Sequence, residues 1–180
     1  YTPALVALKE FGPKVVVATT YQAISGAGKT FKEWPEMVGN IIPYIGGEEE
    51  KSEQEPLRIM GKVVDGKIEK AKLPVITTQC IRVPVLNGRT AAVFVSFEKK
   101  PTKEQIIEKW RSFSGLPQEL NLPSAPKHFI QYLEEDNRPQ VALDVNYENG
   151  FGVSFGRLRE DTVFDYKFVC LLYTSDAADE

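Results

Sequence analysis

Apolar and polar residues alternate along this chain in patterns that predict where helices and strands form. Residues 3–10 fit the end of an amphipathic helix, and the apolar run at residues 15–21 fits a buried strand. Residues 48–60 are polar and then apolar, which predicts a helix. Pro56 is expected to break or kink that helix.

Residues 74–86 and 90–98 each have the composition of a strand, and Asn87-Gly88 lies between them. Because this dipeptide tolerates the positive φ of a tight turn, the two strands are predicted to form a hairpin. Thr102 and Gln105 then have the spacing of a capping box. Apolar residues follow them at helical intervals, so a helix is expected to about Phe113.

A proline-rich connection at residues 116–126 leads to an ending that is predicted to be all strand. Three groups of apolar residues there alternate with polar neighbours, as in half-buried antiparallel strands: Val141, Leu143 and Val145; Phe151, Val153 and Phe155; Phe164, Tyr166 and Phe168. The expected fold is α+β, with a mixed, mainly antiparallel sheet and helices on one face. One domain is expected over residues 1–169, incomplete at both ends. The pattern stops after Val169, so residues 170–180 are predicted to be a non-native or disordered tail.

Composition limits the classes of function that the chain can serve. The 180 residues are 42% hydrophobic and 26% charged, with a formal net charge of -3, which suits one sizeable core. A mildly acidic balance argues against nucleic acid or an anionic membrane as a partner. No apolar run approaches the roughly 20 residues that span a bilayer, and no signal-peptide pattern opens the chain. Cys80 and Cys170, with a single histidine, form no metal-ligand or disulfide pattern, so a reduced, cytoplasmic location is expected.

Two stretches carry candidate chemistry. Gln22 ends the first predicted strand and precedes a loop of very small residues, and Arg82 is an isolated cation in an apolar strand. Desolvating an unpaired guanidinium is costly, so a buried strand normally avoids one. An amide, a backbone that a ligand can approach and a planar cation together suggest a pocket for an anionic small molecule.

Three motifs together resemble one family: TTYQAISGAG at residues 19–28, GGEEEK at residues 46–51 and CIRVPV at residues 80–85. The chain is similar to the C-terminal catalytic and dimerisation part of aspartate-semialdehyde dehydrogenases of the archaeal and fungal-like type. The similarity runs from about residue 2 to Val169 and covers about the second half of the family's sequence. It implies NADP-dependent interconversion of L-aspartate 4-semialdehyde plus phosphate with L-4-aspartyl phosphate, through a cysteine thioester, in lysine, threonine and methionine biosynthesis. A homodimer or homotetramer is implied as well.

The resemblance also assigns roles to residues. Gln22 resembles the substrate-orienting glutamine, and Arg82 the arginine that clamps the substrate's carboxylate. Glu48 and Lys51 resemble the pair that handles the substrate's amino group and phosphate, and Ser25 and Gly26 resemble residues that meet NADP. Each role has an alternative. Gln22 could simply cap a strand, and Arg82 could form an interior salt bridge. Ser25 and Gly26 could belong to an ordinary loop of small residues, and Glu49 or Glu50 could take the role given to Glu48.

The chain departs from the family at Arg89, which stands where the family has its proton-accepting histidine. Arginine stays protonated and cannot act as a general base. It could instead stabilise a thiolate or phosphate, and an error in the sequence at this codon is the other alternative. His128, which follows the proline-rich loop, is expected to be structural or on the surface. Cys80 is expected to be a core residue, because free cysteine commonly is one.

The family's nucleophilic cysteine and nucleotide-binding half precede the matched region, so this piece alone is predicted to be inactive. Two other functions remain open. One is a related acyl-phosphate or acyl-CoA reductase, such as N-acetylglutamyl-phosphate reductase or malonyl-CoA reductase. The other is a non-catalytic dimerisation module, which the arginine at position 89 would suit.

Overall fold

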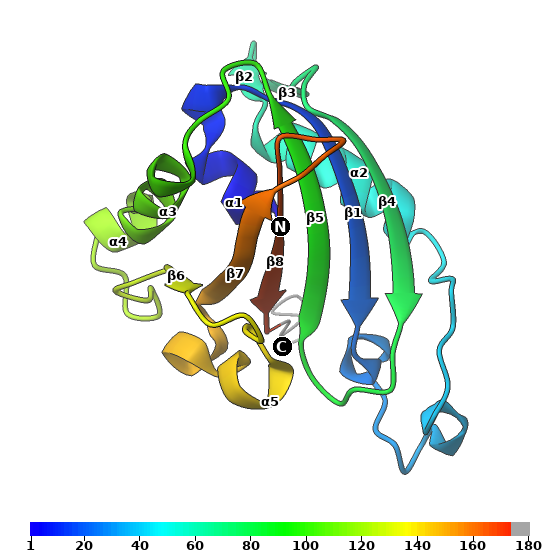
Figure 1. The fold of residues 1–180 in the computed structure, drawn as a ribbon. Coiled ribbons are helices and arrows are strands. Elements are labelled where there is room, and N and C mark those ends of the chain that lie inside the picture. The colour runs from blue at the N-terminus through cyan, green and yellow to red at the C-terminus, as the bar shows by residue number, and fades with distance from the viewer. Residues whose placement is uncertain (174–180) are drawn as a thin grey trace.

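A six-stranded mixed sheet forms the centre of the molecule in a computed structural model that describes residues 1–173 (Figure 1). Its strand order is β4-β1-β5-β8-β7-β6. The β1–β4 and β6–β7 pairs are parallel, and the other three pairs are antiparallel. The strands are β1 (Pro13–Gln22), β4 (Val75–Arg82), β5 (Arg89–Phe97), β6 (Ile130–Leu133), β7 (Val153–Glu160) and β8 (Tyr166–Leu172).

Helices cover one face of this sheet, which confirms the predicted fold class. Figure 1 is viewed from the other face, with α2 behind the strands. The α-helices are α1 (Thr2–Ala7), α2 (Glu48–Ile59), α3 (Lys103–Arg111), α4 (Leu116–Glu119) and α5 (Val141–Asp144). Short 3-10 helices are η1 (Lys9–Phe11), η2 (Ile24–Ala27), η3 (Pro35–Met37) and η4 (Tyr147–Gly150). Within residues 1–173, no helix has the length and hydropathy needed to cross a bilayer.

Trp110 of α3 is the largest fully buried side chain, and it joins the helices to the sheet. Its ring lies 4.7 Å from the ring of Phe155 and 5.0 Å from that of Phe168, measured between centroids. Its indole nitrogen also donates to the backbone oxygen of Ala4 in α1, at 3.4 Å. Aromatic pairs at such distances add stability beyond the apolar area that they bury. The capping box of Thr102 and Gln105 that begins α3 is present as predicted.

The predicted hairpin of residues 74–86 and 90–98 is wrong, although both strands exist. β1 lies between β4 and β5 and pairs with each, so the connection through residues 83–88 crosses the end of β1. The backbone nitrogen of Val83 donates to the backbone oxygen of Gln22 at 3.0 Å, and the backbone nitrogen of Ala23 donates to the backbone oxygen of Gly88 at 3.1 Å. Gly88 has φ of +92°, so the glycine does serve a turn, but one that caps β1.

The predicted strand around Val141, Leu143 and Val145 is also wrong, because residues 141–144 form α5. The Asp144 carboxylate accepts from the backbone nitrogen of Gln140 at 2.7 Å and from Arg138 Nε at 2.8 Å. This buried carboxylate closes the turn, and it overrides the alternation of apolar residues.

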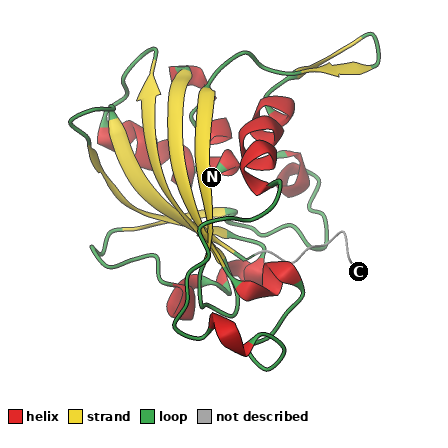
Figure 2. Ribbon diagram, turned by 90° about the vertical axis from the view of Figure 1, so that its right-hand side faces the viewer, coloured by secondary structure: helices red, strands yellow, loops and turns green. Residues whose placement is uncertain are grey.

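The other two alternating groups fall partly within strands, since β7 begins at Val153 and β8 at Tyr166. Three strands were not predicted. One is β6, which pairs in parallel with β7. The other two, β2 (Lys62–Val64) and β3 (Lys67–Glu69), form a small hairpin that projects from the body of the molecule in Figure 2. Its Asp65-Gly66 turn is a hairpin signal that the sequence does contain.

The domain boundary predicted at Val169 falls inside β8. This strand continues to Leu172, and Cys170 and Leu171 are buried, so residues 170–172 belong to the sheet. The rest of the predicted non-native or disordered tail, residues 174–180, lies outside the described residues.

Pro56 neither breaks nor ends α2, which continues to Ile59. Proline lacks the N–H that would bond to the carbonyl four residues earlier, which belongs to Ser52. The Tyr1 hydroxyl donates to that carbonyl instead. Burial, with Cys80 and Glu53 adding to it, raises the pKa of Tyr1, so its hydroxyl remains a donor at neutral pH.

We expect Tyr1→Phe to lower the free energy of unfolding by about 1 kcal/mol, because the partly buried carbonyl of Ser52 loses its donor. In a Pro56→Ala background the new N–H can bond to Ser52, so the same substitution should then cost almost nothing. Urea unfolding of the four proteins measures both effects, with exposed Tyr44→Phe as the control. An equal loss in both backgrounds would contradict this role of the hydroxyl.

Candidate functional site

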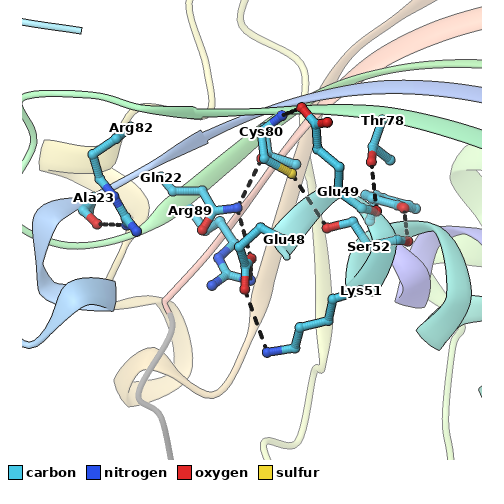
Figure 3. A network of polar contacts seen from close by, with 12 residues as sticks. Gln22, Ala23, Glu48, Glu49, Lys51, Ser52, Thr78, Cys80, Arg82 and Arg89 are labelled. Atoms are coloured by element: carbon cyan, nitrogen blue, oxygen red, sulfur yellow. Dashed lines mark hydrogen bonds and ion pairs between the residues drawn. The ribbon is translucent and has the colours of Figure 1, made fainter. Parts of the chain in front are cut away.

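Three strands bring Gln22, Arg82 and Arg89 to the same end of the sheet (Figure 3). Gln22 is the last residue of β1, and it pairs with Arg82 of β4 on one side and with Arg89 of β5 on the other. Paired residues on neighbouring strands project from the same face of a sheet. The three side chains therefore lie on the face that the helices cover, and the pattern of buried residues agrees, since Gln22 and Arg82 are buried.

Glu48, the first residue of α2, completes this group. Its Oε2 accepts from Gln22 Nε2 at 3.1 Å and lies 3.6 Å from Arg89 Nη1. Its Oε1 lies 3.7 Å from Lys51 Nζ, one helical turn along α2. One carboxylate thus lies among cations, and the site retains an excess of positive charge that favours anionic ligands.

Arg82 is 6% exposed and donates from Nη1 to the backbone oxygen of Ala23 at 2.6 Å. Among residues 1–173 it forms no ion pair, so the alternative of an interior salt bridge is not seen in the described part of the chain. Burial, and then the charge of Arg89, lower the pKa of Arg82, while Glu48 acts in the opposite direction. Arginine still remains protonated at neutral pH. A nearly buried cation without a carboxylate partner in this part of the chain suits an anion that binds there.

Ser25 and Gly26 lie in η2, immediately after β1 and beside Arg82. The backbone nitrogen of Ser25 donates to the backbone oxygen of Leu86 at 3.1 Å. This bond holds η2 against the loop at residues 83–88. A Cβ added at Gly26 would lie 3.2 Å from Arg82 Nη1, so the glycine keeps the space beside the guanidinium open. Residues 26–28 are exposed and small, so a large ligand can approach this backbone closely.

Arg89 lines a cleft of about 400 Å³ together with Thr20, Ser52 and residues near both ends of the described chain. Its side chain is 26% exposed and faces Glu48, so it can stabilise negative charge in the cleft but cannot accept a proton. His128 is exposed and does not line this cleft. Cys80 is buried, with its sulfur 3.7 Å from Ser52 Oγ. Residues 1–173 contain no cluster of three His, Cys, Asp or Glu side chains suited to a metal.

Sequence reasoning missed Thr20, which lies two residues before Gln22 on the same face of β1. Its Oγ1 accepts from Gln22 Nε2 at 3.1 Å. Glu48 and Thr20 together engage the amide nitrogen of Gln22, and a carboxylate can only accept, so the nitrogen must face it. The Oε1 atom of Gln22 is then the group left for a ligand. The period-2 alternation of the strand was the signal that could have identified this residue.

The chain matches known proteins over most of its length. Residues 5–173 match the family model described as semialdehyde dehydrogenase, dimerisation domain. Aspartate-semialdehyde dehydrogenase of Schizosaccharomyces pombe is 42% identical over 171 residues, which is 92% of this chain and 48% of that protein. The enzyme of Methanothermobacter thermautotrophicus is 40% identical over 151 residues, 84% of this chain and 43% of that protein. The chain spans about half the length of the curated relatives that it matches.

Solved structures agree with the sequence matches. Aspartate semialdehyde dehydrogenase with NADP from Candida albicans has a TM-score of 0.83 and 34% identity, over 94% of this chain and 49% of that one. Aspartate semialdehyde dehydrogenase II from Vibrio cholerae, in complex with ASA, has a TM-score of 0.67 over 94% of this chain and 52% of that one. At 20% identity, the second likeness concerns the fold alone.

We expect Thr20→Val to lower the free energy of unfolding by about 1–2 kcal/mol, because the Gln22 amide loses an acceptor in a buried setting. Thr20→Ser keeps the hydroxyl and should retain most of the stability. Thr19→Val, on the opposite face of β1, is the matched control and should stay within about 0.5 kcal/mol of the parent. Urea unfolding measures all three, and equal effects of the two valine substitutions would rule out the proposed contact.

Proposed function

Because this chain belongs to the semialdehyde dehydrogenase family, we propose that it is part of an NADP-dependent aspartate-semialdehyde dehydrogenase. The reaction interconverts L-aspartate 4-semialdehyde and phosphate with L-4-aspartyl phosphate, in the biosynthesis of lysine, threonine and methionine. The relatives are about twice as long as this chain. The cysteine that forms the thioester and the nucleotide-binding half are proposed to lie in a part of the protein outside this sequence, and the protein is proposed to be cytoplasmic.

The convergence of Gln22, Glu48, Arg82 and Arg89 in one site is the observation that carries this proposal. Arg82 would bind the carboxylate of the substrate through two parallel hydrogen bonds, which its planar fork favours. Glu48 would bind the ammonium group, and Gln22 Oε1 would accept a hydrogen bond from the substrate and so fix its orientation. Lys51, which is half-exposed beside Glu48, would bind phosphate.

NADP would accept or supply the hydride in this reaction. Ser25 and Gly26 would hold part of the cofactor, because their small side chains leave the backbone accessible beside Arg82. The related Candida albicans protein has been solved with NADP.

Arg89 would act by charge, since it stands where the resemblance places a proton-accepting histidine. It would stabilise the negative charge of phosphate or of a thiolate and leave proton transfer to another group. Positioned acid–base groups contribute about 100- to 10,000-fold in rate, so an enzyme with arginine here would be slow.

The face of the sheet without helices is proposed to pair with a second copy of this chain, in a homodimer or homotetramer. It carries partly exposed apolar side chains, including Tyr21 at 39% and Val75 at 61% exposure. Such a patch normally marks an interface.

The same face would serve a non-catalytic dimerisation module, and the arginine at position 89, in place of a proton-accepting histidine, is the observation that favours this second candidate. A related acyl-phosphate or acyl-CoA reductase would keep the same site geometry and change the substrate.

The protein that contains this chain should form NADPH from L-aspartate 4-semialdehyde only when phosphate is present, and the 180-residue piece alone should not. Arg82→Lys in the longer protein should lower kcat/KM about 100-fold, mainly through KM, because lysine cannot reproduce the bidentate contact. Arg58→Lys, an exposed arginine of α2, is the control. A longer protein that forms dimers but turns over none of the candidate substrates would support the dimerisation module instead.

Arg89→His in the longer protein should raise kcat by about 100-fold or more, because histidine can take and give a proton near neutral pH. The gain should appear as pH rises through about 6.5, where imidazole becomes a neutral base. Arg89→Gln serves as the control, since it removes the charge without supplying a base. A pH–rate profile compares the three proteins, and equal rates for both variants would disprove the assignment.

A further inference from the structure

Two carboxylates of α2 that take no part in the site described above attach this helix to β4. Figure 3 shows one of them, Glu49, beside Cys80. Glu53 Oε1 accepts from the backbone nitrogen of Thr78 at 2.9 Å, and Glu49 Oε1 accepts from that of Cys80 at 3.2 Å. Thr78 Oγ1 donates in return to the backbone oxygen of Glu49 at 3.2 Å. The helix and the strand are therefore joined along two successive turns of α2.

The position of β4 explains why these bonds matter. β4 is the edge of the six-stranded sheet, so alternate N–H groups on its outer side have no strand to bond to. Carboxylates supply charge-assisted acceptors for two of them. Glu49 and Glu53 stand four residues apart on one helix face, where like charges repel each other. The spacing of Glu49 and Glu53 therefore does not stabilise α2 itself, and it is explained by their bonds to β4.

The bond between Glu49 and Cys80 lies next to the proposed substrate site. Glu49 directly follows Glu48, and Cys80 comes two residues before Arg82. The Glu49–Cys80 bond fixes the first turn of α2 against the end of β4, and this turn carries the carboxylate that lies 3.1 Å from Gln22 Nε2. We propose that Glu49 is a positioning residue, which holds Glu48 in the site by tying α2 to the edge strand. The catalytic consequence rests on the proposed function, whereas the bond itself does not.

Glu49→Ala in the longer protein should lower kcat/KM for the semialdehyde about 10-fold, through KM, and leave KM for NADP within twofold of the parent. Glu49→Gln should restore activity, because its amide oxygen can still accept. In a Glu48→Ala background, Glu49→Ala should cause less than a twofold further loss, since it acts through the missing carboxylate. An equal loss in both backgrounds would overturn the proposal.

Glu53→Ala is the matched control. It removes an equivalent bond one turn farther from the site, so it should leave kcat/KM within twofold of the parent. Hydrogen exchange gives a readout without catalysis: Glu49→Ala should speed exchange of the Cys80 amide, and Glu53→Ala that of the Thr78 amide. Unchanged exchange at Cys80 would disprove the bond even if the longer protein had no dehydrogenase activity. If Glu49→Ala does not fold, Glu49→Asp replaces it in both measurements, because aspartate keeps the charge but is one methylene too short to keep the bond to the Cys80 amide.

Discussion

The pairing of β1 with β4 on one side and with β5 on the other decides where the chemistry of this molecule lies. It sets Gln22 opposite both Arg82 and Arg89, so an amide and two cations meet at one end of the sheet. A hairpin of β4 and β5 would have left Gln22 outside this row. The loop at residues 83–88 has to cross the end of β1, and the backbone groups that it exposes there also fix η2.

Positive charge exceeds negative charge around this row, which favours an anionic ligand. Glu48 lies within 4 Å of Lys51 and Arg89, whereas Arg82 has no carboxylate partner within residues 1–173. A guanidinium that is nearly buried costs free energy unless its N–H groups are bonded. Ala23 satisfies part of this requirement, and an anionic ligand would satisfy the rest.

α2 connects the site to the rest of the fold because side chains and backbone groups along its length are bonded to other segments. Glu48 faces the site, Glu49 and Glu53 bond to the edge of β4, and Pro56 is accommodated because the Tyr1 hydroxyl bonds to Ser52. A helix fixed at so many points can hold a carboxylate with the accuracy that binding needs.

The sequence alone determined the local features: the capping box at Thr102, the strands that contain Gln22 and Arg82, and the motifs that indicate the family. These depend on neighbours within a few residues. Strand order and the extent of β8 depended on contacts between distant segments. The helix at residues 141–144 depends on a local side chain instead, because the Asp144 carboxylate bonds to Arg138 and Gln140, six and four residues earlier, and the alternation of apolar residues did not reveal these bonds. The sequence also left three adjacent glutamates as candidates for one role. Only the tertiary structure separated them, because the direction of each side chain depends on how α2 packs against β4: Glu48 points into the site, Glu49 bonds to Cys80, and Glu50 is exposed.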